Sequence, residues 1–197
     1  MKMLVVATKN KGKIEEIKKV MSGMPFEVVS MGDIGINIEV NEDGTTFEEN
    51  SMKKAQEICK VSNSIVLADD SGIEVDYLDG APGIYSARFG GSEATDNDRN
   101  EKLLNMLKDV PFDKRTARFV CAIAIAFPDG RSFVVRDTCE GFIGFECKGS
   151  NGFGYDPLFY VKQYEMTMAE LEMDVKNKIS HRAKALNKMA KKIVDYI

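Results

Sequence analysis

Apolar residues along this chain follow two spacings, one typical of buried strands and one typical of amphipathic helices. The run 3–7 predicts a buried strand, and apolar positions at helical spacing between 14 and 21 predict a helix directly after it. A second strand is expected at 26–30. The acidic stretch from 32 to 44 has little periodicity, so we expect a loop with some extended structure there.

The middle of the chain continues to alternate between the two spacings. Thr46 and Glu49 stand at capping-box spacing ahead of an apolar face, which predicts a helix. An apolar strand is expected at 64–68, ending in an acidic pair, and a separate half-buried strand at 73–78. The segment 97–107 is predicted to be helical.

The second half of the chain contains the clearest hairpin signal. Two long strand-like runs within 117–141 surround Pro-Asp-Gly, a typical turn sequence. Another strand is expected at 142–147. Thr167 and Glu170 repeat the capping-box spacing and predict a short helix, and the last helix is expected to begin near Ser180.

Interleaved helices and strands followed by a hairpin indicate an α/β or α+β fold with a mixed sheet. At 197 residues the chain is long enough for one domain, or for two small lobes around a shared core. We see no internal repeat and no obvious linker.

Composition narrows the class of protein. The net charge of −4 argues against general binding to nucleic acid or to membrane surfaces. The N-terminal apolar run is too short for a signal peptide, and no stretch approaches the roughly 20 apolar residues of a membrane span. We therefore expect a cytoplasmic protein. No Cys-x-x-Cys pair occurs, so we expect free core thiols at Cys59, Cys121, Cys139 and Cys147.

The turn "TKNKGK", residues 8–13, lies between the first predicted strand and helix. Free backbone N–H groups at a helix N-terminus favour an anion. Lys9, Lys11 and Lys13 oppose the helix dipole there, so they destabilise the helix unless a ligand compensates them. A solvated basic turn is the alternative. A Walker P-loop is excluded because the Gly-Lys-Ser/Thr ending is absent.

The adjacent carboxylates Asp69 and Asp70 end the predicted strand 64–68. Their mutual repulsion is unfavourable unless a cation or hydrogen-bond donors meet them, and hard divalent cations suit such oxygen ligands. Successive strand residues point to opposite faces, so we expect one of the pair to face the site. An ordinary aspartate turn is the alternative.

Two further segments carry candidate chemistry. In "SNGFGYDPLFY", Gly152 and Gly154 space Phe153 and Tyr155, so the backbone can approach a ligand and a ring can stack on a nucleobase. Core packing of these aromatics is the alternative reading. In "KNKISHRAKAL", Ser180 is a plausible N-cap that places basic side chains in the first turn of the last helix.

A nucleoside triphosphate with Mg²⁺ would suit all four segments together. Its phosphates would bind the lysines, the metal would bind the carboxylates, and the nucleobase would stack on the aromatic ring. Nucleophilic catalysis is not favoured, because there is no Gly-x-Ser-x-Gly elbow and no cysteine with a histidine partner. Water activated by a metal and a carboxylate is the favoured mechanism.

Five motifs in order make the chain resemble the inosine triphosphate pyrophosphatase family, also described as Ham1-like. They are Thr8-x-Asn10-x-x-Lys13, "TFEEN", "ADDSGIEVDYLDGAPGIYSARF", "GFGYDP" and "SHRAKAL". The resemblance implies a single domain over 1–197 with an elongated α/β fold, a mixed central sheet flanked by helices, and a cleft between two lobes. It also implies a homodimer, Mg²⁺ dependence, and hydrolysis of ITP, dITP and XTP to monophosphate and pyrophosphate.

The resemblance also implies roles for individual residues. Catalysis is assigned to Asp70, Asp69 and Lys13, and metal binding to Glu42 and Asp70. The implied substrate-binding residues are Thr8, Asn10, Lys13, Lys54, Ser71, Phe153, Gly154, Tyr155, Asp156, Lys176, His181 and Arg182.

Several alternatives stay open at this point. A Maf-like pyrimidine nucleotide pyrophosphatase and a nucleotide-sensing module without turnover are the competing functions. The general base is either Asp69 or Asp70, and the ranking of ITP, dITP and XTP is not indicated. A donor such as Arg182 or a backbone N–H facing O6 would favour a 6-oxo purine over adenine.

Overall fold

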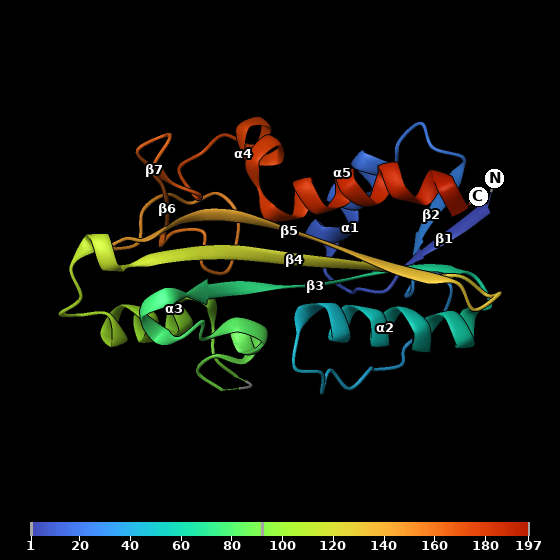
Figure 1. The fold of residues 1–197 in the computed structure, drawn as a ribbon, viewed down its shortest axis with the longest axis horizontal. Helices are drawn as coiled ribbons and strands as arrows, with labels where there is room; N and C mark the ends of the chain where they lie inside the picture. The colour runs from blue at the N-terminus through green and yellow to red at the C-terminus, as the bar shows by residue number, and fades with distance from the viewer. Residues whose placement is uncertain (1, 92, 197) are drawn as a thin grey trace. The chain divides into compact units, whose positions relative to one another are not determined.

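The computed structural model describes residues 2–91 and 93–196. Within this part of the chain, seven strands form one sheet in the order β2-β1-β3-β4-β5-β6-β7 (Figure 1). The strands are β1 (Lys2–Val6), β2 (Phe26–Ser30), β3 (Ile65–Val75), β4 (Thr116–Ala126), β5 (Ser132–Ile143), β6 (Phe159–Val161) and β7 (Met166–Thr167). β1 pairs in parallel with β2 and β3, and β6 pairs antiparallel with β5 and β7. The predicted mixed sheet is confirmed.

Helices flank this sheet, as the sequence predicts for an α/β fold. The α-helices are α1 (Lys11–Met21), α2 (Phe47–Ser62), α3 (Asp96–Met106), α4 (Met173–Ile179) and α5 (His181–Ile193). Short 3₁₀ helices occupy Asp76–Leu78, Gly83–Arg88, Phe112–Lys114 and Val194–Tyr196. None of the helices in the described residues combines the length and apolar character needed to cross a membrane.

The chain divides into two compact units. Unit 1 comprises Met1–Asp70, Cys121–Asp137 and Arg182–Ile197, and unit 2 comprises Ser71–Val120 and Thr138–His181. Strands β3, β4 and β5 therefore contribute residues to both units. The single domain over 1–197 stays a prediction.

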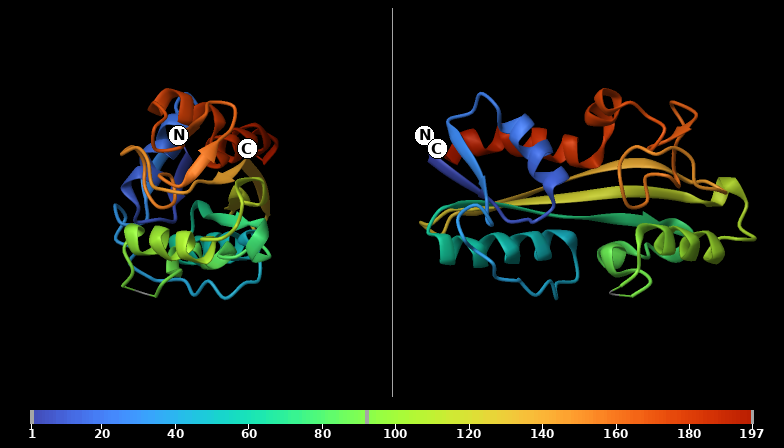
Figure 2. Two further views of the ribbon diagram at one scale, coloured as in Figure 1. Left: turned by 90° about the vertical axis from the view of Figure 1, so that its left-hand side faces the viewer. Right: turned by 180° about the vertical axis from the view of Figure 1, so that it is seen from behind.

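In unit 1, the strand alternation sorts apolar side chains to two faces. Leu4 and Leu67 belong to a core that includes residues of α1 and α5, whereas Val5 and Val66 belong to a core that includes residues of α2. Figure 1 and the right-hand view of Figure 2 show α2 on one side of the unit-1 strands and α1 with α5 on the other. This two-sided burial explains why β1 reads as a continuous apolar run.

Unit 2 has a core of its own, which joins its strands to α3. Ile73 of β3 and Phe159 of β6 pack in one buried cluster with Leu103 and Leu107, from α3 and the residue after it. The loop 144–158 between β5 and β6 ends in this core through Tyr155 and Leu158.

The acidic pair does not end a strand, which corrects the expectation of two strands at 64–68 and 73–78. β3 runs without a break from Ile65 to Val75 and carries Asp69 and Asp70 in its interior. The physical reason is electrostatic: Asp69 is buried against the cation of Lys13, so burial of its charge is compensated.

Two other predicted elements were wrong. No separate strand forms at 142–147: β5 ends at Ile143, and the carbonyl of Gly144 accepts a hydrogen bond from the side chain of Arg115 at 2.7 Å. No helix starts after Thr167, whose N–H donates to Glu170 Oε2 at 2.7 Å and closes a turn. The short strands β6 and β7 lack a sequence signal long enough to predict them.

The cysteine prediction was right in part. None of the four cysteines forms a disulfide, and Cys59, Cys121 and Cys139 are buried as expected. Cys147 is exposed, because the strand predicted around it does not form.

Candidate active site

The turn between β1 and α1 is shaped by its own polar side chains. Thr8 Oγ1 accepts a hydrogen bond from the N–H of Asn10 at 3.2 Å, and Asn10 is the N-cap whose Oδ1 accepts from the N–H of Lys13 at 3.1 Å. The first turn of α1 contains no acidic side chain. The Thr-x-Asn-x-x-Lys spacing therefore fixes where α1 begins and places Lys13 in its first turn.

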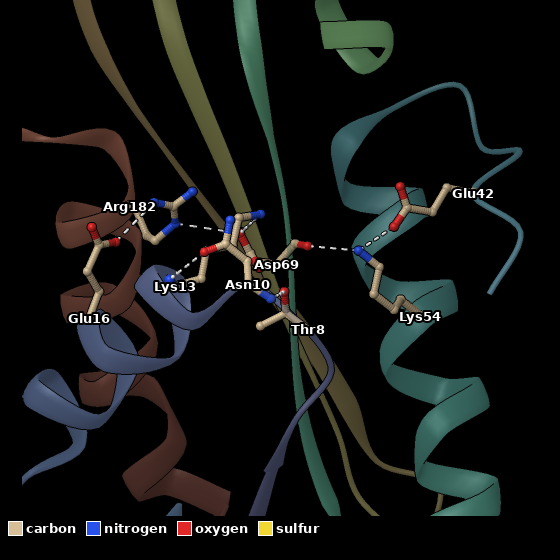
Figure 3. A network of polar contacts seen from close by, with 8 residues as sticks. All are labelled: Thr8, Asn10, Lys13, Glu16, Glu42, Lys54, Asp69 and Arg182. Carbon is tan, nitrogen blue, oxygen red and sulfur yellow. Dashed lines mark hydrogen bonds and ion pairs between the residues drawn. The ribbon is translucent and has the colours of Figure 1, made fainter. Parts of the chain in front are cut away.

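Asp69 is the centre of a polar network in unit 1 (Figure 3). Its Oδ2 lies 2.7 Å from the Lys13 ammonium and 3.6 Å from Nε of Arg182. The Lys54 ammonium donates to its backbone carbonyl at 3.0 Å. The positive charge of Lys13 at the start of α1 is therefore compensated by a buried aspartate of the same unit. This corrects the expectation that only a ligand compensates that charge.

Two further acids complete the network. Nη1 of Arg182 contacts Glu16 Oε2 at 3.0 Å, and the Lys54 ammonium forms an ion pair with Glu42. Figure 3 shows Lys54 on α2, with Glu42 on the loop before it and Asp69 on the other side of the ammonium. Three cations from α1, α2 and α5 therefore surround one strand position.

The electrostatics of Asp69 exclude it as a proton acceptor near neutral pH. Burial alone would raise the pKa of Asp69. The surrounding positive charges, Lys13 first and then Arg182 and Lys54, outweigh burial and hold that pKa far below its usual range. Asp69 is an anion that fixes the cations in place.

Asp70 has the opposite electrostatic environment. Burial, reinforced by the negative charge of Glu42, raises the pKa of Asp70 to about 6, although Lys54 and the side chain of Asn50 act in the other direction. Two carboxylates that disfavour each other's charge form a pair that a cation would stabilise.

This pair fits one particular class of metal site. Among residues 2–91 and 93–196, no group of three or more His, Cys, Asp or Glu side chains is arranged to hold a metal. Mg²⁺ commonly takes one or two carboxylates and keeps waters or substrate phosphates as its other ligands. Glu42 and Asp70 suit that pattern and do not suit a closed all-protein site.

The loop that carries Glu42 is tied to the start of α2. The N–H of Gly44 donates to Asn50 Oδ1 at 2.8 Å, and the half-buried Lys53 contacts the exposed Asp43 at 2.6 Å. A side chain at Gly44 would meet Asn50 Oδ1 at 2.7 Å, so the position accommodates only glycine. Asn50 thus contacts the acidic loop, and its side chain also acts on the pKa of Asp70.

The Gly-aromatic loop in unit 2 is held by a buried ion pair. Asp156 Oδ2 accepts from the Lys176 ammonium at 2.6 Å and from the N–H of Phe153 at 2.9 Å. The Lys176 ammonium also lies 5.4 Å from the centre of the Phe153 ring, and that ring is 44% exposed. Gly152 has a φ of +83°, and a side chain there would collide with Asp156 and Lys176.

Tyr155 is part of the unit-2 core. Its hydroxyl donates to the carbonyl of Ser86 at 2.8 Å, and burial raises its pKa well above the usual value. His181 stacks on Phe119, with ring centres 4.8 Å apart. Of the two aromatics on either side of Gly154, Phe153 is therefore the one that presents a ring to solvent.

Comparisons with known proteins agree with the family resemblance of the motifs. The Ham1 family model matches residues 4–192. This chain belongs to the Ham1 family. It is 50% identical to a dITP/XTP pyrophosphatase of Bacillus cereus, with 100% of this chain and 97% of that protein covered. It is 54% identical to the dITP/XTP pyrophosphatase of Desulforamulus reducens, with 94% and 92% covered.

Solved structures of Ham1 proteins have the same fold. The Staphylococcus aureus Ham1 protein is 40% identical to this chain with a TM-score of 0.91, and each chain is covered in full. A Ham1 protein from Coxiella burnetii is 34% identical with a TM-score of 0.92, covering 99% of this chain and all of that one.

Within this Ham1 chain, the predicted site residues fall into two groups. The unit-1 group is a connected network of Thr8, Asn10, Lys13, Glu42, Lys54, Asp69, Asp70 and Arg182. The unit-2 loop residues Phe153, Asp156 and Lys176 contact one another. Ser71 follows Asp70 along β3, and His181 precedes Arg182 at the start of α5. Their assignment to substrate binding stays a prediction.

Sequence reasoning missed Glu16 and Asn50. Glu16 follows Lys13 by three residues on α1, so both lie on one face of the helix, but nothing in the spacing says that its partner is Arg182. Asn50 is the last residue of the "TFEEN" motif and is buried at the start of α2. A buried polar residue in the first helical turn is the signal that could have marked it.

Proposed function

We propose that this protein hydrolyses the nucleoside triphosphates dITP, ITP and XTP to the monophosphate and pyrophosphate. The first support comes from relatives that are about half identical to this chain over nearly their full length and carry the name dITP/XTP pyrophosphatase. The observation that carries the proposal is the contrast between the two adjacent aspartates, one held as an anion among cations and one whose pKa is raised to about 6.

In this proposal, Asp70 is the general base. In the metal-free protein the pKa of Asp70 is raised to about 6, whereas that of Asp69 is held far below its usual range, so Asp70 is the better proton acceptor of the two. Asp70 takes a proton from the attacking water, and Asp69 keeps Lys13 and Arg182 in place. Removing the carboxylate of Asp70 should therefore abolish turnover while leaving the network around Asp69 intact.

We further propose that Glu42 and Asp70 hold Mg²⁺ together with the substrate. When bound, Mg²⁺ supplies neutralisation of the charge that develops on the phosphates. Lys13 and Lys54 bind phosphate oxygens, and the N–H groups at the start of α1 add donors to the same anion. Lys54 stays protonated, since the acids around it outweigh its burial and raise its pKa.

The purine is proposed to bind at the unit-2 loop, where the exposed ring of Phe153 offers a stacking surface. The Lys176 ammonium beside this ring is a donor only, so it favours the 6-oxo group of hypoxanthine or xanthine over the amino group of adenine. One mismatched buried donor costs about 1–3 kcal/mol, which corresponds to roughly tenfold to a hundredfold discrimination.

Neither alternative function gains support from the relatives described above, whose names specify dITP and XTP. The homodimer and the cytoplasmic location remain proposals. Light scattering on the purified protein tests the first: a mass of one chain at micromolar concentration contradicts it.

The deciding experiment is a panel of nucleotides with identification of the products. Purified protein with Mg²⁺ is expected to release pyrophosphate and monophosphate from dITP, ITP and XTP, with much lower rates for ATP, GTP, dTTP and UTP. Chelation of the metal should stop the reaction. Release of orthophosphate alone would refute the proposed bond cleavage, and a preference for dTTP or UTP would indicate the pyrimidine alternative.

A further inference from the structure

Both backbone polar groups of Gly154 are bound by side chains of α3. The N–H of Gly154 donates to Asp96 Oδ2 at 2.7 Å, and its carbonyl accepts from Asn100 Nδ2 at 3.0 Å. Asp96 and Asn100 stand four residues apart on α3, so they lie on one face of the helix. All three residues belong to unit 2.

The two side chains of α3 are themselves held in place. Asp96 Oδ1 accepts from Nη1 of Arg99 at 2.7 Å, which leaves Oδ2 directed at the loop. Asn100 is only 3% exposed, so its amide has little freedom to rotate away. Gly154 has a φ of +64°, a conformation that favours glycine.

We propose that Asp96 and Asn100 are positioning residues for recognition of the nucleotide base. By holding the backbone of Gly154, they fix the direction in which the neighbouring Phe153 presents its ring. The inference rests on the proposed function, because it assigns the base to this loop. Neither residue is proposed to touch the nucleotide.

The reason that the loop needs such contacts is its conformational freedom. Gly149, Gly152 and Gly154 all have positive φ, and glycine-rich segments lose the most entropy when they are ordered. A loop that is ordered before binding does not pay that cost when the ligand arrives, so the affinity is higher.

The anchoring contacts follow one another along residues 153–155 and leave the ring of Phe153 on the surface. The N–H of Phe153 is bound by Asp156, both polar groups of Gly154 by α3, and the hydroxyl of Tyr155 by the Ser86 carbonyl. Phe153 nevertheless keeps 44% of its surface exposed. Burial of an aromatic ring is the usual use of such a loop, so this arrangement points to presentation of the ring.

The test compares Asp96→Ala and Asn100→Asp with the wild-type enzyme. Asn100→Asp keeps the size of the side chain but replaces the donor with an oxygen that faces the Gly154 carbonyl. We expect KM for ITP to rise about tenfold and kcat to change by less than about twofold, with a matching fall in the preference for ITP over ATP. Asp96→Asn retains an acceptor oxygen and should lie nearer to wild type than Asp96→Ala.

Asp98→Ala is the matched control. Asp98 forms the capping box of α3 with Thr95 and has no part in binding Gly154, so its loss weakens the helix start and spares the contacts to the loop. This variant should lose stability and keep the wild-type KM and nucleotide preference. If it reproduces the kinetic changes of Asp96→Ala, stability of α3 explains them and the positioning role is refuted.

A second readout does not depend on turnover. Amide hydrogen exchange in the nucleotide-free protein should be faster at Gly154 in Asp96→Ala and unchanged there in Asp98→Ala. Unchanged exchange and unchanged KM in both loop variants would overturn the inference while leaving the enzyme active. Failure of the wild-type protein to release pyrophosphate from ITP would instead refute the proposed function, whatever the variants do.

Discussion

The carboxylate of Asp69 lies 2.7 Å from the ammonium of Lys13, although Asp69 is only 2% exposed. This pair joins the middle of β3 to the first turn of α1, and Arg182 adds a second cation from α5. A buried anion with several cationic partners is costly to form and costlier to break, because the loss of one partner leaves buried charge without compensation.

Asp69→Asn should therefore destabilise the fold by about 3 kcal/mol in urea or guanidinium denaturation at neutral pH, since it leaves Lys13 and Arg182 facing a neutral amide. Asp43→Asn is the matched control. It breaks a lysine pair of similar length on the surface, with 60% of the Asp43 side chain exposed, and should change stability far less. Equal effects of the two substitutions would contradict a structural role for the buried pair.

The same pair predicts a pH dependence with a definite sign. The pKa of Asp69 is lowered in the folded state, so its contribution is fully present above the unfolded pKa of about 3.9 and is lost as the pH falls below it. The stability difference between wild type and Asp69→Asn should accordingly shrink below about pH 4. A difference that stays constant down to pH 3 would argue against an ionised Asp69.

The raised pKa of Asp70 predicts the opposite behaviour in the metal-free protein. Folding disfavours the ionised form, so the penalty is absent below about pH 4 and complete above about pH 6. Asp70→Asn should therefore stabilise the metal-free fold by about 2 kcal/mol near pH 7.5 and have no such effect near pH 4. Denaturation curves at the two pH values measure the difference.

The proposed roles of Asp70 in metal binding and catalysis predict how Mg²⁺ changes stability and how Asp70→Asn changes turnover. Mg²⁺ should raise the melting temperature of the wild-type protein, and it should have little effect on Asp70→Asn or Glu42→Gln. Turnover of ITP by Asp70→Asn should fall about 10²–10⁴-fold, since the general base is removed. An Asp70→Asn variant that keeps wild-type turnover would take Asp70 out of the mechanism.

The sequence predicted the framework of the fold because local patterns encode it. Phe26–Ser30 is a strand with the predicted bounds, and the hairpin around Pro-Asp-Gly forms β4 and β5. The prediction failed where a long-range contact overrides a local pattern. The two charges inside β3 look like the end of a strand until the partners of Asp69 from α1 and α5 are known.

The candidate site was predictable to the same degree. Motif spacing selected Lys13 and the two aspartates, but it gave no indication that Glu16 would hold Arg182 or that α3 would hold Gly154. Those contacts join residues 166 and 58 positions apart in the chain. No periodicity spans such distances, so only the folded structure reveals these partners.

Gly152 and Gly154 in the unit-2 loop allow the effect of backbone strain to be compared with that of a side-chain collision. Both have positive φ, but a side chain at Gly152 would strike the Asp156–Lys176 pair, whereas one at Gly154 meets nothing within 4 Å. Gly154→Ala should cost about 1–2 kcal/mol of stability from backbone strain alone. Gly152→Ala should cost about 3 kcal/mol or more because it also disrupts a buried ion pair. Similar losses in urea denaturation would contradict this picture of the loop.

The exposed ring of Phe153 yields the most direct test of where the base binds. Phe153→Leu removes the stacking face, and loss of one stacking contact is worth about 1–3 kcal/mol, so KM for ITP should rise roughly tenfold or more. Stability should change little, because 44% of the residue is already exposed. Phe145→Leu is the control: Phe145 is 61% exposed and lies in the same interstrand loop, but its ring packs on Arg115. Steady-state kinetics with ITP should be altered by the first substitution and unaffected by the second, and equal KM values for the two variants would move the base away from this loop.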